Sequence, residues 1–137
     1  MEDDIVVDIS DPDDIVAARK AGHQLALELG FSLTDVTMIA TAISEIARNI
    51  TSYAGRGEVR VLVADREGRR ALVVRAEDDG PGIADIERAM EDGYSTGRGL
   101  GMGLPGARRL MDRVMVESAL GRGTVVEMWK WVPTGAG

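Results

Sequence analysis

The stretch EVRVLVADREGRRALVVRAEDD, residues 58–79, alternates apolar and polar side chains with a period of two on both sides of a short charged turn. Such alternation is typical of β-strands that bury one face, and Arg66-Glu67-Gly68-Arg69 supplies the turn between them. The sequence therefore predicts an antiparallel hairpin that ends in the acidic pair Asp78-Asp79, and a β-sheet as the framework of the fold.

Two helices are predicted before this hairpin, after a short strand at residues 4–9. Ser10-Asp11-Pro12 provides an N-cap and a helix-starting proline for the first helix, which is expected to end near Gly30. Ser32-Leu33-Thr34-Asp35 resembles a capping box and opens the second helix. The second helix is the firmer prediction, because its apolar stripe keeps a helical period throughout: Val36, Ile39, Ala40, Ile43, Ile46, Ala47 and Ile50.

A third helix and a second hairpin are predicted after the first hairpin. The helix is expected at residues 102–112, and the strands at 113–118 and 124–132 flank Gly121-Arg122-Gly123. Residues 133–137 are expected to form a disordered tail. Together these elements predict a single α+β domain at residues 1–132, a two-layer sandwich whose mixed, mostly antiparallel sheet carries helices on one face.

The composition narrows the class of protein. The chain has 137 residues, of which 45% are hydrophobic and 28% are charged, as in soluble globular domains, and it has no cysteine. A formal net charge of −7 argues against a nucleic-acid partner, which would require clustered basic residues. The acidic start and the lack of a long apolar run argue against a signal peptide or membrane span. We therefore expect a cytoplasmic protein without nucleic-acid or membrane partners.

Polar residues on the second helix lie away from its apolar stripe. Glu45 and Asn49 are four residues apart, so their side chains lie one above the other. An ordinary solvated helix face would explain such a pair. An asparagine carbonyl can also ligate Mg²⁺, and a neighbouring carboxylate can hold a water molecule or accept a proton.

Two glycine clusters interrupt the chain after the first hairpin. Asp78-Asp79-Gly80-Pro81-Gly82 follows a strand; it can serve as a tight turn, or its aspartate can accept a hydrogen bond from the exocyclic amine of adenine. The second cluster, residues 97–104, leads into a helix. It can be a flexible linker, but its free backbone amides at a helix N-terminus favour a phosphate-binding loop.

Four elements in fixed order resemble the N, G1, G2 and G3 boxes of the GHKL superfamily of ATP-binding proteins. They are Glu45-x-x-x-Asn49, Asp78-x-Gly80-x-Gly82, Gly99-x-Gly101-x-Gly103 and Gly121-x-Gly123-Thr124. The resemblance covers about residues 5–132 and implies the Bergerat ATP-binding fold. Within the superfamily, residues 44–59, 78–112 and 123–131 are most similar to small bacterial serine/threonine switch kinases of the RsbT type.

The resemblance implies a role for each matching position. Glu45 would be the catalytic base, Asn49 the Mg²⁺ ligand, and Asp78 the acceptor for adenine, with Thr124 in support. Residues 84–100 would form the lid, and Arg48 and Arg98 would be either additional phosphate or partner contacts or solvated residues. The remaining positions implied to contact the nucleotide are Gly80, Gly82, Ile83, Ser95, Thr96, Gly99, Leu100, Gly101, Met102, Gly103 and Leu104.

The same resemblance implies the activity and partners. We expect an ATP- and Mg²⁺-dependent kinase that phosphorylates STAS-domain substrate and scaffold proteins of a stressosome pathway. When released, it would activate a PP2C-type phosphatase or similar downstream regulator. The alternative is an anti-sigma factor that sequesters a partner with little catalysis. A sensor histidine kinase is disfavoured, because the one histidine, His23, lies inside the first predicted helix.

Overall fold

A computed structural model describes residues 4–78, 80, 103–119 and 123–133 of the chain. The order of its elements confirms the sequence prediction. Strand β1 (Ile5–Ile9) is followed by helices α1 (Pro12–Glu28) and α2 (Leu33–Asn49) and by the π-helical turn η1 (Ile50–Ala54). The remaining elements are β2 (Gly57–Arg66), β3 (Arg69–Asp78), α4 (Gly103–Leu110), β4 (Arg113–Ala119) and β5 (Gly123–Trp131).

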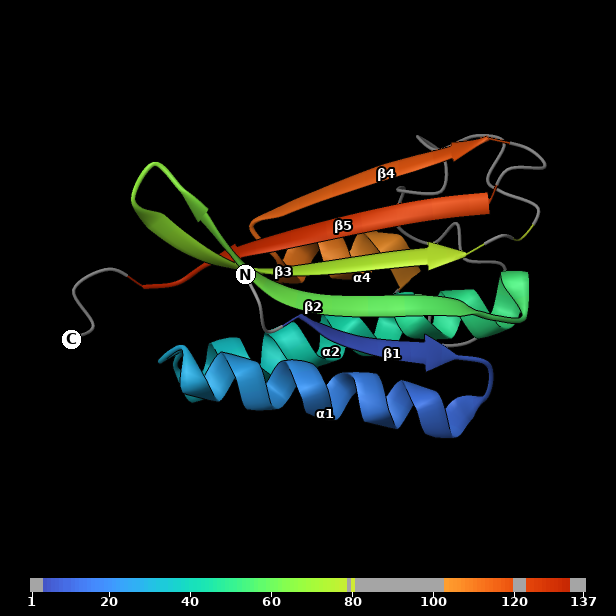
Figure 1. The fold of residues 1–137 in the computed structure, drawn as a ribbon, viewed down its shortest axis with the longest axis horizontal. Helices are drawn as coiled ribbons and strands as arrows, with labels where there is room; N and C mark the ends of the chain where they lie inside the picture. The colour runs from blue at the N-terminus through green and yellow to red at the C-terminus, as the bar shows by residue number, and fades with distance from the viewer. Residues whose placement is uncertain (1–3, 79, 81–102, 120–122, 134–137) are drawn as a thin grey trace.

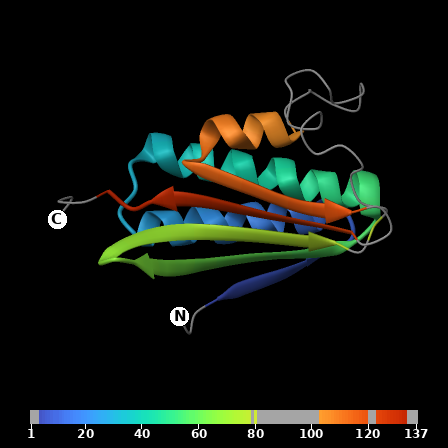
Figure 2. The same cartoon turned by 90° about the horizontal axis from the view of Figure 1, so that it is seen from above.

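The five described strands form one sheet in the order β1-β2-β3-β5-β4. Each neighbouring pair in this order is antiparallel, which confirms the mostly antiparallel sheet. Helices α1, α2 and α4 cover one face of the sheet, and the other face is open (Figures 1 and 2). The described residues therefore form the predicted two-layer α+β sandwich.

The helix starts follow from local hydrogen bonds. Asp11 caps α1 by accepting from the Asp13 amide at 2.9 Å, and Asp14 accepts in return from the backbone amides of Ser10 and Asp11. This second half of a capping box was not predicted. Ser32 caps α2 as predicted, because its hydroxyl accepts from the Asp35 amide at 3.1 Å.

The main core lies between the helices and the sheet. The predicted apolar stripe of α2 is buried there, from Val36 to Ile50. Helix α1 contributes only small buried residues, Ala18, Gly22 and Ala26, so its backbone lies close to α2. His23 is exposed on α1, as expected for a residue without a site role.

A second apolar cluster lies on the open face of the sheet. Ala71, Val73 and Trp129 form its buried centre, and Trp131 packs beside Trp129 with ring centroids 5.7 Å apart. The Arg66 and Arg69 guanidinium groups lie over these two rings, 5.0 and 4.9 Å from the centroids. These two cationic side chains therefore cover part of the apolar cluster on the open face.

Helix α2 ends in a way that the periodicity did not predict. The α-helical stretch stops at Asn49, and residues 50–54 continue as a π-helical turn that ends at Gly55, where φ is 87°. The third predicted helix also ends earlier than residue 112, at Leu110. Asp112 instead connects to β5, since its amide donates to the Trp129 carbonyl and its carboxylate accepts from the Trp131 amide.

Candidate functional site

The last turns of α2 carry the predicted catalytic and metal-binding residues. Glu45 and Asn49 are both partly buried, and only 13% of the Glu45 side chain is exposed. Arg48 donates from Nη1 to Glu45 Oε2 at 2.9 Å, while 47% of its own side chain remains exposed. Glu45 is thus a shielded carboxylate held by an arginine, which differs from an ordinary solvated helix position.

The predicted adenine acceptor lies at the end of the central strand. Asp78 is the last residue of β3, and its direct partners across the sheet are Gly57 on β2 and Thr124 on β5. Side chains alternate along a strand, so Asp78 lies on the same face as the buried core residues Val74 and Ala76. The structure therefore places Asp78 and Thr124 side by side on the helix-covered face, as the predicted pair requires.

The first glycine cluster begins as a tight turn stabilised by its own aspartate. The Gly80 amide donates to Asp78 Oδ1 at 2.9 Å. This is the hydrogen bond of an Asx turn. The turn and the predicted acceptor therefore share one side chain, that of Asp78.

The C-terminal end of α2 and the end of β3 lie at the same end of the molecule (Figure 1). Helix α2 and the turn η1 both contact β3. The structure therefore places three predicted site elements at this same end: the Glu45 and Asn49 pair, the Asp78 turn, and Thr124. Gly57 pairs with Asp78 across the sheet but was not predicted as a site residue. The sequence signal that could have identified it is a glycine at the start of a strand, which often marks a close approach of a backbone or a ligand.

Much of the predicted phosphate site falls outside the described residues. Gly103 and Leu104 open helix α4, so a helix does begin at the second glycine cluster, as predicted. The predicted lid at residues 84–100 and Arg98 lie outside the described part. So do the predicted nucleotide contacts Gly82, Ile83, Ser95, Thr96, Gly99, Leu100, Gly101 and Met102.

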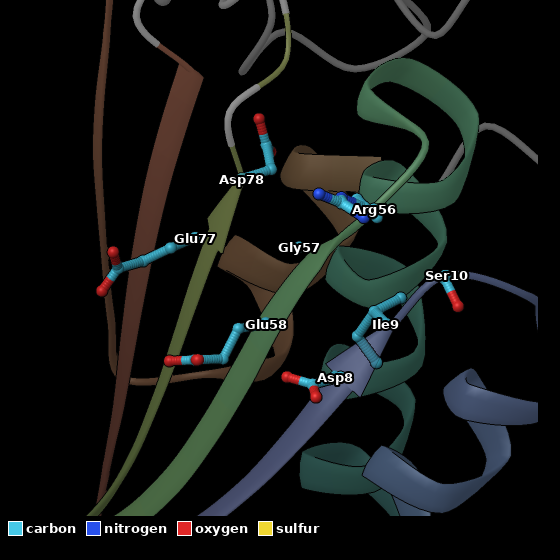
Figure 3. Close-up of a pocket in the computed structure, with 8 residues that line it drawn as sticks. All are labelled: Asp8, Ile9, Ser10, Arg56, Gly57, Glu58, Glu77 and Asp78. Carbon is cyan, nitrogen blue, oxygen red and sulfur yellow. The ribbon is translucent and has the colours of Figure 1, made fainter.

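A hollow of about 490 Å³ lies at the ends of β1, β2 and β3 (Figure 3). Asp78 lines it, but Glu45 and Asn49 do not. Its carboxylates Asp8, Glu58 and Glu77 are direct neighbours across the three strands, on the face opposite to the core. Figure 3 shows Glu58 and Glu77 pointing away from α2. Among the predicted site residues that the structure describes, Asp78 is the one that lines this hollow.

Arginines compensate the acidic residues of this open face. Arg75 donates to Glu77 at 2.8 Å and to Glu127 at 3.0 Å. Its pKa is raised, mainly by the hydrogen bond to Glu77. Arg60 bonds Glu58 at 3.2 Å, and this bond is the main cause of its raised pKa. Glu58 and Glu77 thus belong to ion pairs on the open face of the sheet.

The donor set at the helix-covered face fits a magnesium nucleotide. Among the described residues, no group of three acidic or histidine side chains is arranged to hold a metal ion by itself. Protein-bound Mg²⁺ commonly keeps several waters and uses one or two protein oxygens plus substrate phosphates. A single amide oxygen from Asn49 is compatible with that mode, and the Asp78 carboxylate is an acceptor suited to an amine.

Comparison with known proteins identifies the class. The chain belongs to the family of histidine kinase-, DNA gyrase B- and HSP90-like ATPases, whose model matches residues 34–134. The serine/threonine-protein kinase RsbT of Bacillus subtilis (strain 168) is 52% identical over 133 residues, covering 96% of this chain and 99% of that protein. The family prediction and the predicted likeness to RsbT-type kinases are therefore confirmed.

Two further relatives carry a different name. The anti-sigma F factor of Clostridium acetobutylicum is 36% identical over 118 residues, covering 82% of each chain. That of Thermoanaerobacter sp. (strain X514) is 32% identical over 120 residues, covering 84% of this chain and 83% of the relative.

None of the described helices is long and apolar enough to cross a membrane.

Proposed function

We propose that the chain is an ATP-dependent serine/threonine protein kinase that switches regulatory partner proteins by phosphorylating them. The observation that carries the proposal is the 52% identity, over nearly the whole of both chains, to a protein named as such a kinase. The shielded Glu45 and the paired Asp78 and Thr124 support it, because kinase chemistry needs a proton acceptor and a nucleotide-orienting acceptor.

The predicted site residues have separate roles in nucleotide binding and in phosphoryl transfer. Asp78 accepts from the adenine amine, and Thr124, directly opposite, supports this contact. Asn49 would hold Mg²⁺ through its amide oxygen, and the ion would supply positive charge beside the phosphates of the nucleotide. Glu45 accepts the hydroxyl proton of the substrate serine or threonine, and its hydrogen bond from Arg48 orients the carboxylate. The glycine-rich residues before α4 hold the phosphates through backbone amides.

The likeness to the RsbT kinase also supports a more specific proposal about the partner proteins. The substrate is a small STAS-domain protein, or a stressosome scaffold that contains such a domain. A PP2C-type phosphatase or a similar regulator is the downstream target of the released kinase. A cytoplasmic location, expected from the sequence, remains a prediction.

The kinase proposal is tested by following the transfer of labelled phosphate from ATP to a partner protein. The purified chain is incubated with Mg²⁺ and ATP labelled at the γ-phosphate, together with a purified STAS-domain protein from the same source. We expect label on one serine or threonine of that protein, and strongly reduced label with Asp78→Asn. Nucleotide binding without transfer to any STAS-domain protein of the source would contradict the kinase proposal.

A sequestering factor is the second candidate, favoured by the anti-sigma F factors at 36% and 32% identity. In this case the chain would form a stable complex with a sigma factor, and the nucleotide would mainly shape the binding surface. Incubation of a source lysate with the labelled nucleotide separates the two candidates. A stable sigma-factor complex without a labelled protein would support sequestration.

A further inference from the structure

The turn η1 follows the proposed magnesium ligand Asn49 without a break. The Gly55 amide donates to the Ile50 carbonyl at 2.9 Å, which is the five-residue spacing of a π-helix. Single π-helical turns are rare and are often found at functional sites. Here the wider turn changes where the last residue of the segment, Ala54, lies relative to the sheet.

Ala54 lies directly against the turn that carries the adenine acceptor. A Cβ atom added to Gly80 would be 2.6 Å from Ala54 Cβ and 2.8 Å from Ala54 Cα. Real Cβ atoms essentially never show distances this short. The Gly80 backbone therefore packs against Ala54 with no room for a side chain at position 80. Since Gly80 also bonds Asp78 Oδ1, the position of Ala54 sets the position of the acceptor.

Gly57 confines Asp78 from the other side. A Cβ atom added to Gly57 would overlap the Glu77 carbonyl oxygen and would lie 3.0 Å from both Asp78 Cβ and Ile50 Cγ2. Ile50 is the first residue of η1 and is buried in the core. The end of β3 is thus enclosed between the start of β2 and both ends of the π-helical turn.

We infer that η1 is a positioning element, in which Ala54 sets the adenine acceptor Asp78 through Gly80. The inference rests on the proposed function, because it assigns to η1 the role of fixing Asp78 relative to the magnesium ligand Asn49. Asn49 directly precedes this continuous helical segment, and Ala54 at its end contacts the acceptor turn. Adenine and the metal-bound phosphates are parts of one nucleotide. A constant distance between Asp78 and Asn49 therefore favours the binding of both parts at the same time.

The test enlarges each of the two touching residues in turn. Gly80→Ala should weaken ATP binding by about tenfold or more, because the added methyl group displaces the turn from Ala54. The φ angle of Gly80 is outside the left-handed region, so alanine adds a contact there and no backbone strain. Ala54→Val enlarges the other side of the same contact and leaves Gly80 and Asp78 unchanged, so it should lose affinity as Gly80→Ala does.

The control is Ala17→Val, on the exposed side of α1, which makes the same substitution away from the site and should leave ATP affinity unchanged. Affinities are measured by calorimetry, and circular dichroism verifies the fold of each variant. Wild-type affinity in a folded Ala54→Val variant would overturn the inference. So would wild-type affinity in Gly80→Ala.

A second measurement needs no nucleotide. The amide at position 80 bonds Asp78 Oδ1, so its hydrogen exchange, followed by NMR, reports whether the turn is intact. We expect faster exchange in both Gly80→Ala and Ala54→Val. Wild-type protection in Ala54→Val would contradict the positioning role. Absence of ATP binding by the wild-type chain, with exchange accelerated as expected in both variants, would instead refute the proposed function and leave the steric contact supported.

Discussion

Replacing Glu45 by alanine should slow phosphoryl transfer to the partner by about 100-fold and leave ATP affinity within about threefold of wild type. The proposed base contacts the substrate hydroxyl and not the nucleotide, so its loss acts on turnover. General bases typically contribute 10²–10⁴-fold, and the low end applies because the loose transition state of phosphoryl transfer depends less on proton removal.

The fold should tolerate this substitution. The substitution removes the hydrogen bond between Glu45 and Arg48, one helical turn away, and the arginine is 47% exposed, so water can replace its partner. Glu45 lies off the apolar stripe of α2, and alanine is the best helix former. A reduced rate in Glu45→Ala would therefore reflect lost chemistry rather than lost structure.

The assay is single-turnover phosphorylation of the partner at saturating ATP, with nucleotide affinity measured on the same preparations. Glu45→Gln keeps the size of the side chain but cannot accept the proton, so it should be as slow as Glu45→Ala. Glu28→Ala removes an exposed carboxylate at the end of α1 and serves as the matched control with a wild-type rate. A rate for Glu45→Ala within a fewfold of wild type would refute the catalytic role.

Three further predictions concern binding and stability. Asp78→Asn should weaken ATP binding strongly with an unchanged melting temperature, because an amide nitrogen cannot accept from adenine; wild-type affinity in calorimetry would remove the adenine assignment. Asn49→Ala should lose more affinity with Mg²⁺ than without it, and equal losses would mean that Asn49 is not a metal ligand. Backbone amides of Ser10 and Asp11 lower the pKa of Asp14 below its usual 3.8, so the carboxylate stabilises the fold above that pH. Asp14→Asn should therefore lower the melting temperature at pH 7, and the difference from wild type should disappear as the pH falls through the lowered pKa; a constant difference would contradict this.

The site was predictable where a single segment defines it. The spacing of Glu45 and Asn49 on a helix, and the position of Asp78 at a strand end, follow from local periodicity. The burial of Glu45 was not predictable in the same way, because helical spacing gives its direction from the apolar stripe but not what packs around it. The π-helical turn was also missed, since the apolar pattern of α2 continues through Ile50 without a visible change.

The amino-acid sequence by itself determined the elements, because each strand, helix and cap depends on neighbours along the chain. The hairpin of β2 and β3 and the caps at Asp11 and Ser32 are examples. Tertiary structure alone decided which distant residues meet. Thr124 lies opposite Asp78 because β5 pairs with β3, and Ala54 touches Gly80 because η1 packs on the end of that strand. Such contacts depend on how the layers pack together, and no local period encodes that packing.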